Sequence, residues 1–261
     1  MEKSTAMKMS FTRSRSLLQA MLLAGLALLA TGVANAATGV PLERARVDIR
    51  DVASMQRGAR NFVNYCMGCH SAQYVRYNRL GEDLQIPEDE LVRELMFAAQ
   101  KPQETMTIAL RASDADRWFG TAAPDLSLIA RNRGVDYLYN FLRYFYADPS
   151  RPTGVNTLML DNAAMPHVLW ELQGVREAVF EEQGSGDSAQ KVFKEFRQLT
   201  PGKLSPEEFD AFVRDTVAFL AYVGEPMQLE RRRLGVWVLG FLLVFGILAY
   251  LLKREIWKDV K

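Results

Sequence analysis

The stretch from Asn61 to Leu80 reads NFVNYCMGCHSAQYVRYNRL, and it contains both cysteines and one of the two histidines of the 261-residue chain. Cys66 and Cys69 are separated by two residues, and His70 follows at once. Cysteine pairs at this spacing carry redox, metal-binding or cofactor-attachment chemistry. The role of these three side chains therefore decides what kind of domain surrounds them.

Three interpretations fit a Cys-x-x-Cys-His sequence: a thioredoxin-like dithiol, a zinc site, and the covalent attachment of a c-type haem. A closed zinc site needs four ligands in spaced pairs, and the chain has only two Cys and two His. A thioredoxin-like dithiol belongs to a βαβ unit, whereas the residues before Cys66 have helical spacing. The residues favour haem c, with both thiols bound to the vinyl groups of one porphyrin and His70 ligating the iron.

The ligand on the other face of the iron decides between an electron carrier and a haem protein with an open site. The candidates are His167 and a set of methionines, namely Met55, Met67, Met96, Met106, Met159, Met165 and Met227. Met165 lies in the sequence LDNAAMPHVLW (residues 160–170), where the following Pro166 forces an extended backbone that can present its side chain. The residues favour Met165 and leave most other methionines as core filler. Ligation by His167, or a surface or propionate-side position for His167, stays open.

The N-terminus indicates export. Basic residues precede an apolar run from Leu17 to Ala30, and the small-x-small sequence Ala34-Asn35-Ala36 follows it. This order predicts a signal peptide over residues 1–36, with an uncleaved N-terminal anchor as the alternative.

The C-terminus predicts a transmembrane helix over residues 231–252. Its last 19 residues, 234–252, carry no charge, and a helix of that length covers about 28 Å, close to one hydrocarbon core. A buried core helix would show a polar stripe, and this run has none. Basic residues flank both ends, so the positive-inside rule barely discriminates. The signal peptide therefore sets the expected orientation, with residues 253–261 as a short cytoplasmic tail.

The expected exported domain, residues 37–230, is acidic. It contains 21 Lys plus Arg and 28 Asp plus Glu, a net charge of about −7. Such a surface attracts cationic partners and disfavours nucleic acid, although ordinary solubility explains a charge of this size equally well.

The helical patterns predict a mainly α fold, a c-type cytochrome haem domain with long loops. Helices are expected from Met55 to Cys66, from Glu88 to Ala99, from Val135 to Phe145, and after the N-cap Ser205, which precedes a proline and two glutamates. The first and last of these would cross and clamp the haem. No strand pattern is convincing, and the polar segment Glu171–Lys203 is expected to be a solvent-exposed helix and loop.

From about Val52 to its C-terminus the chain resembles the cytochrome c1 family, the haem-bearing subunits of cytochrome bc1 complexes. The resemblance rests on NYCMGCHSAQYVRYNRL (64–80), AAPDLSLIARNRGVDYLYNFL (122–142), PTGVN (152–156) with AAMPHVLWE (163–171), and DTVAFLAYVGEP (215–226) before the anchor helix. The chain departs from the family pattern at Ala123, where a second proline is frequent, and at Pro166-His167.

The resemblance implies one covalent haem c and a set of residues around it. Cys66 and Cys69 would hold the haem, with His70 and Met165 as axial ligands. Three further residues would lie at the porphyrin and its propionate, namely Pro124, Arg133 and Tyr137. A surface ion pair is the alternative for Arg133.

By the same resemblance, the chain would relay single electrons from a Rieske iron-sulfur protein to a soluble or tethered c-type cytochrome. It would be anchored beside cytochrome b in a bacterial inner membrane, with the haem domain in the periplasm, and would catalyse nothing alone. The competing interpretations are a membrane-tethered haem sensor or peroxidase-like protein with an open sixth coordination site, and a donor subunit of a different membrane oxidoreductase.

Overall fold

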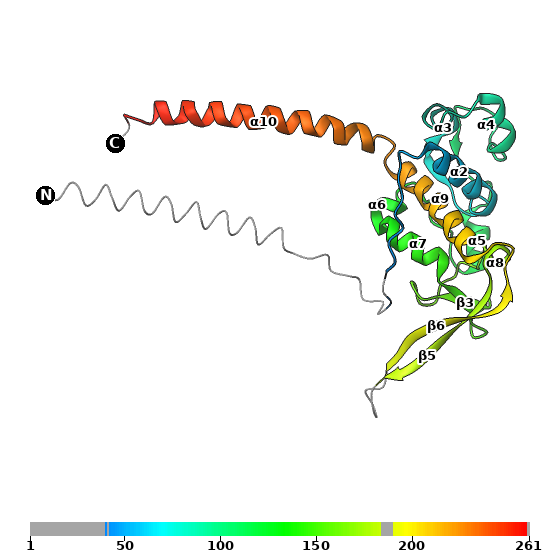
Figure 1. The fold of residues 1–261 in the computed structure, drawn as a ribbon. Coiled ribbons are helices and arrows are strands. Elements are labelled where there is room, and N and C mark those ends of the chain that lie inside the picture. Colours follow the sequence, from blue (N-terminus) through cyan, green and yellow to red (C-terminus); the bar gives the residue numbers. More distant parts are fainter. Residues whose placement is uncertain (1–39, 41, 184–189, 260–261) are drawn as a thin grey trace. The chain divides into compact units, whose positions relative to one another are not determined.

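The computed structural model of the chain describes residues 40, 42–183 and 190–259. The predicted signal peptide lies outside the described residues, as do the last two residues of the predicted tail. Helices dominate the fold (Figure 1), which confirms the expected mainly α class. They are α2 (Val52–Tyr65), α3 (Tyr77–Leu84), α4 (Glu88–Glu94), α5 (Ala112–Phe119), α6 (Ile129–Arg133), α7 (Val135–Arg143), α8 (Trp170–Gln173), α9 (Pro206–Gly224) and α10 (Gln228–Ile256).

The predicted crossing of the first and last helices of the haem domain is present as α2 and α9, which lie side by side (Figure 1). Gly58 makes the close approach possible, because a Cβ at this position would lie 2.1 Å from the carbonyl oxygen of Asp215. The Asp215 carboxylate accepts hydrogen bonds from Ser54 at 2.5 Å and from Arg57 at 2.6 Å. Backbone contact and a shared carboxylate therefore join the two helices.

The start of α9 follows the predicted capping pattern. The Ser205 hydroxyl accepts the N–H of Glu208 at 3.2 Å, and the Glu208 carboxylate accepts the N–H of Ser205 at 2.9 Å. Pro206 occupies the first helical position, where its missing N–H costs nothing. Local sequence alone therefore sets where this helix begins.

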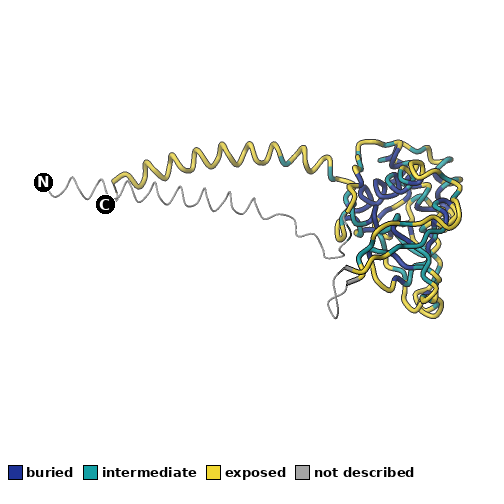
Figure 2. The backbone as a smooth tube through the Cα atoms, turned by 60° about the horizontal axis from the view of Figure 1, so that its bottom comes forward, coloured by how far each residue is buried: buried dark blue, intermediate teal, exposed yellow. Residues whose placement is uncertain are grey.

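The hydrophobic core gathers around α2 and α9. Figure 2 shows the buried residues, in dark blue, in the folded domain outside α10. Phe62 of α2 packs against Phe219 of α9 with ring centroids 5.5 Å apart. Most of the seven candidate methionines are core residues, as expected from the flexibility of their side chains; those buried are Met55, Met67, Met96, Met106 and Met159.

The expectation that the chain lacks strands is wrong. Within the described ranges, three antiparallel pairs are formed: β1 (Ala72–Arg76) with β2 (Thr105–Met106), β3 (Phe145–Ala147) with β4 (Val155–Thr157), and β5 (Gly174–Gln183) with β6 (Gln190–Pro201). The first two pairs are too short to produce a recognisable period-two pattern.

The segment Glu171–Lys203 is also corrected, because most of it is the β5–β6 hairpin. Register shifts at Val175/Arg176 and at Val179/Phe180 interrupt the alternation that marks a strand. On β6, Phe193 and Phe196 are three residues apart, a spacing that mimics a helix. Cross-strand packing overrides this local signal, with Phe180 opposite Phe193 and Ala178 opposite Phe196.

Two expected helices are shorter than predicted. α4 ends at Glu94 because Leu95 and Met96 turn into the core, where both are buried. α7 ends at Arg143 because Phe145 pairs with Thr157 in the β3–β4 sheet.

The helix α10 contains the predicted transmembrane segment and extends into the predicted tail. Among the described residues it is the helix long and apolar enough to cross a membrane, with a mean hydropathy of 2.4 and none of its apolar window buried. Figure 2 shows this exposure along the helix. An apolar surface of this length is unsuited to water and suited to lipid.

Candidate functional site

The Cys-x-x-Cys-His sequence forms a tight turn at the C-terminal end of α2. The N–H of Cys66 donates to the Phe62 carbonyl at 2.8 Å and so continues the helical pattern. The N–H groups of Cys69 and His70 then both donate to the Cys66 carbonyl, at 3.1 and 2.9 Å. Both thiols are free and partly buried. The structure thus brings the three predicted attachment residues together on one turn.

The environment of Cys66 disfavours dithiol chemistry. Burial raises the pKa of the Cys66 thiol to about 12, and the neighbouring Cys69 contributes in the same direction. A dithiol oxidoreductase needs a thiolate with a lowered pKa. Cys66 instead stays protonated at neutral pH.

The imidazole of His70 is oriented by a backbone carbonyl. Its Nδ1 lies 2.7 Å from the carbonyl oxygen of Pro124, so Nδ1–H donates this bond and Nε2 keeps its lone pair. Burial lowers the pKa of His70, while the bond to Pro124 and the charge of Asp125 act in the opposite direction. A neutral imidazole held through Nδ1 is the form that ligates a metal through Nε2.

The Pro124–Ser127 segment also fixes the chain that follows His70. The Asp125 carboxylate accepts the N–H of Gln73 at 3.0 Å, and the Ser127 hydroxyl accepts the N–H of Tyr74 at 3.1 Å. The roles of Asp125 and Ser127 were not predicted from the sequence. Asp and Ser side chains often accept hydrogen bonds from backbone N–H groups, and this tendency was the only sequence signal for their role.

Met165 differs from the core methionines. It is partly buried and packs against the edge of the hydrophobic core, as Cys66 does. We call residues 160–170 the methionine loop; it runs from the end of the β3–β4 sheet to the start of α8. Met227, at the other extreme, is 46% exposed beside the start of α10.

His167 is inside the protein, so the surface position considered for it is wrong. The residue is 8% exposed, and its ring stacks on Phe145 with centroids 5.0 Å apart and an interplanar angle of 5°. Burial, with the positive charge of Arg176, lowers the pKa of His167 to about 4. His167 is therefore neutral at physiological pH.

Arg133 and Tyr137, predicted to share a propionate region, are neighbours in the structure. The guanidinium carbon of Arg133 lies 5.6 Å from the centroid of the Tyr137 ring. The Tyr137 hydroxyl donates to the carbonyl of Met159 at 3.4 Å, and its ring stacks on Phe141. Arg133 itself is exposed and keeps N–H groups available to a carboxylate.

The side chains present fit a covalent haem. Two free thiols, a neutral imidazole with an unused Nε2 and a partly buried thioether are the donors that a c-type haem requires. In the part of the chain that the structure describes, no three His, Cys, Asp or Glu side chains cluster around a common metal position. The donor set therefore suits an iron held by a porphyrin.

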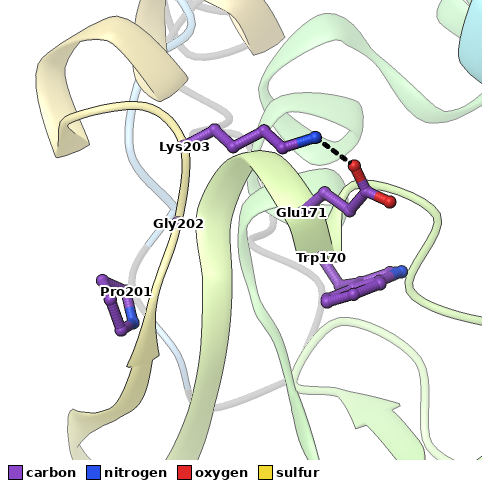
Figure 3. A pocket seen from close by; sticks show the side chains of 5 residues that line it. All are labelled: Trp170, Glu171, Pro201, Gly202 and Lys203. Carbon is purple, nitrogen blue, oxygen red and sulfur yellow. Dashed lines mark hydrogen bonds and ion pairs between the residues drawn. The ribbon is translucent and has the colours of Figure 1, made fainter.

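An open pocket of about 390 Å³ lies beside the methionine loop (Figure 3). It is lined by Trp170, Glu171, Pro201, Gly202 and Lys203. The Lys203 ammonium pairs with the Glu171 carboxylate, and the Lys203 N–H donates to the Glu171 carbonyl at 2.9 Å. Both charged groups are thus used to close the base of the β5–β6 hairpin, and the pocket supplies no free acid or base.

Comparison with known proteins agrees with this donor set. Residues 45–260 match the model of the Cytochrome C1 family. The chain is similar to a cytochrome c1 of Allochromatium vinosum, with 50% identity over 240 residues that cover 92% of this chain and 96% of the relative.

Two further relatives show how widely the similarity extends. An ammonia monooxygenase gamma subunit of Nitrosomonas europaea is 44% identical over 221 residues, covering 85% of this chain and 89% of that protein. The mitochondrial cytochrome c1 haem protein of Saccharomyces cerevisiae is 25% identical over 229 residues, covering 81% and 68%. The family match spans most of the sequence and includes the attachment turn, the methionine loop and α10. The chain belongs to the cytochrome c1 family.

Proposed function

We propose that Cys66 and Cys69 hold the haem c of this chain through thioether bonds and that His70 and Met165 are its axial ligands. The observation that carries the proposal is the 2.7 Å hydrogen bond from His70 Nδ1 to the Pro124 carbonyl, which leaves Nε2 unused beside two free thiols. Arg133 and Tyr137 would hold one propionate, because a guanidinium and a phenol can both donate to a carboxylate. Pro124 would border the porphyrin while its carbonyl orients His70.

Membership of the family makes the chain an electron-transfer component of the cytochrome bc1 complex, with one covalently bound haem c and a single-pass membrane anchor. When bound, the haem supplies a one-electron couple between ferric and ferrous iron. Ligation by the His70 imidazole and the Met165 thioether would leave no open position on the iron, which suits electron transfer. The chain's own residues bind and orient the group, and we propose that the chain alone is not an enzyme.

The proposed partners follow from membership of the family. We propose that a Rieske iron-sulfur protein reduces this chain, which then reduces a soluble or tethered c-type cytochrome. The acidic haem domain would attract a basic acceptor electrostatically, and salt would screen this attraction. A rate of acceptor reduction that falls as ionic strength rises would support this attraction, and a constant rate would contradict it.

The proposed topology places the haem domain in the periplasm of a bacterium. It rests on the predicted signal peptide and on the apolar α10, whose exposed surface would lie against lipid and cytochrome b. Residues 231–252 would cross the membrane and residues 253–261 would remain cytoplasmic. Protease added to intact spheroplasts should remove the haem domain and spare the C-terminal tail.

The ligand assignment is tested with Met165→Leu, and Met106→Leu is the matched control, because Met106 was another candidate ligand and is fully buried in β2. We expect Met165→Leu to lose the weak far-red absorption band of methionine-ligated ferric haem, to bind carbon monoxide when reduced, and to have a lower midpoint potential. Met106→Leu should retain the band. An unchanged band in Met165→Leu would show that another residue closes the iron.

Covalent attachment is tested separately, with a stain for haem on denaturing gels. Cys66→Ala combined with Cys69→Ala should leave no haem on the polypeptide, since no other cysteine exists in the sequence. Haem that remained on the denatured double variant would contradict the assignment.

A further inference from the structure

We infer that His167 is a positioning residue, whose ring, stacked on Phe145, fixes the methionine loop so that Met165 faces the iron. The inference rests on the proposed ligation by Met165 and adds the means by which that ligand is held. The ring of His167 stacks on Phe145 of β3, and Gln173 of α8 and Arg176 of β5 lie close enough to act on its pKa.

The first anchor of the methionine loop lies two residues before Met165. Ala163 is 5% exposed, and its N–H donates to the Asn156 side-chain oxygen at 3.5 Å. Asn156 is itself 2% exposed, and its oxygen also accepts the N–H of Thr157 at 2.9 Å. This end of the loop is therefore tied to β4 by a buried amide.

The second anchor lies two residues after Met165. Pro166 restricts the backbone of Met165 to extended conformations. The His167 ring then lies flat on Phe145, and the His167 carbonyl accepts the N–H of Trp170 at 3.3 Å, which leads the chain into α8. Because the ring is buried on all sides, it cannot turn away without opening the core.

Both anchors rest on the same two-stranded sheet. Phe145 pairs with Thr157 and Tyr146 pairs with Asn156, so the two side chains that hold the loop come from adjacent positions of the β3–β4 register. Residues 163–167 contact the β3–β4 sheet at both ends, so this five-residue segment has few backbone conformations available. Met165 is its central residue, which is why the position of its thioether depends on both anchors.

The base of the β5–β6 hairpin lies near His167. Gln173 donates to the Arg143 carbonyl at 2.8 Å, and Arg176 donates to the same carbonyl. Arg176 also lies over the Phe196 ring, with 3.9 Å between the guanidinium carbon and the ring centroid. Both Gln173 and Arg176 are close enough to the imidazole to act on the pKa of His167.

The test compares His167→Ala, which removes the stacked ring, with His167→Phe, which keeps a flat ring of similar size. Both are made in the full-length, haem-loaded chain within the detergent-solubilised complex. We expect His167→Ala to lose at least half of the far-red band intensity and to bind carbon monoxide in part, and His167→Phe to retain the band. Full intensity in His167→Ala would overturn the inference, as would a loss in His167→Phe as large as that in His167→Ala.

If the His167→Ala chain does not assemble into the complex, a second variant tests the same inference. Phe145→Leu keeps an apolar side chain but removes the flat partner of the imidazole, so it should also weaken the band. Hydrogen exchange of residues 160–170 should be faster in this variant, because the second anchor is lost. Unchanged exchange together with an unchanged band would overturn the inference.

Two controls separate the possible failures. Leu91→Ala truncates a fully buried side chain of α4, remote from the methionine loop, and should lower thermal stability while the band keeps its intensity. Met165→Leu should abolish the band. If Met165→Leu leaves the band intact, the proposed ligation fails; if it abolishes the band and His167→Ala does not weaken it, the positioning role alone fails.

Discussion

His70 and Met165, the two proposed axial ligands, are held by different kinds of structure. His70 follows the last turn of α2, and the backbone bonds of one short turn connect it to Cys66 and Cys69. The Pro124–Ser127 segment then accepts hydrogen bonds from the His70 imidazole and from the backbone N–H groups of Gln73 and Tyr74. This side of the site combines one local turn with a single distant segment that binds the chain around it.

Met165 has no regular element of its own. Its loop is held by an amide from β4 and an aromatic ring from β3. These contacts are made by side chains, and they come from two separate strands. We call the structure around His70 the histidine side of the site and the structure around Met165 the methionine side. The histidine side should tolerate most changes to side chains near the attachment turn, whereas the methionine side depends on the packing of residues that are dispersed in the sequence.

The largest expected effect is on the helix crossing that supports the histidine side. Gly58→Ala would place a Cβ 2.1 Å from the Asp215 carbonyl oxygen and 2.7 Å from the Phe219 Cβ, so the helices must separate. We expect the free energy of unfolding to fall by about 3 kcal/mol or more, measured by chemical denaturation.

Gly68→Ala is the matched control for this crossing. Gly68 lies inside the attachment turn, but an added Cβ would meet nothing within 4 Å. Its unfolding free energy should stay within about 0.5 kcal/mol of the unaltered protein. Equal losses in the two variants would show that the turn, and not the crossing, is the sensitive part.

An intermediate effect is expected from Asn156→Ala, which removes the amide anchor of the methionine loop. Loss of a buried acceptor leaves the N–H groups of Ala163 and Thr157 without that partner and should cost about 1–3 kcal/mol. The far-red band should weaken as well, because the first anchor of the loop is gone. Absorption spectra and denaturation of the same preparation measure both changes.

Asn61→Ala is the control on the histidine side. Asn61 donates to the Phe212 carbonyl at 3.2 Å and to the Thr216 hydroxyl at 3.1 Å, joining α2 to α9. It should lower stability while the band keeps its intensity. A band that weakened equally in both variants would remove the distinction between the two sides.

The smallest expected effect is at the start of α9. Ser205→Ala deletes the hydroxyl that caps the helix and should cost about 1 kcal/mol, without any change in the far-red band. Ser113→Ala, at an exposed helical position in α5, should change stability by less than about 0.5 kcal/mol. Thermal unfolding of the two variants side by side gives the difference.

The same cap has a defined pH dependence. The Glu208 carboxylate accepts a hydrogen bond from the Ser205 N–H. This bond, and to a smaller extent the Ser205 side chain, lowers the pKa of Glu208 from its ordinary value of 4.5. A lowered pKa in the folded state means that the stabilising contribution is present above pH 4.5 and is lost as pH falls through the folded-state pKa. Glu208→Gln should therefore destabilise at neutral pH and converge with the unaltered protein in acid.

Elements with local signals were predictable. The helix α2 lies within a few residues of its expected range, and α9 starts at its predicted cap. The apolar run predicted to cross the membrane is contained in α10. Capping, proline at the first helical position and uniform hydrophobicity all act within one segment, so they can be identified without knowledge of the fold.

The β5–β6 hairpin was not predictable for the opposite reason. Its aromatic side chains are stabilised by cross-strand and β3 neighbours, such as Phe193 opposite Phe180 and Tyr146 beside Phe180. Gly174 begins the hairpin with a φ of +81°, and a Cβ there would lie 2.2 Å from the Thr200 carbonyl oxygen. These contacts join residues that are far apart in sequence, and the register shifts hide the strand period.

The site divides in the same way. The pattern Cys66-x-x-Cys69-His70 could be interpreted without a structure, because its chemistry depends on a fixed spacing within five residues. Three other features became visible only in the folded chain: the burial of His167 against Phe145, the orientation of His70 by the Pro124 carbonyl, and the hydrogen bond from Ala163 to Asn156. The physical reason is that spacing along the chain is a covalent property, whereas stacking, burial and long-range hydrogen bonds exist only after distant segments have packed together.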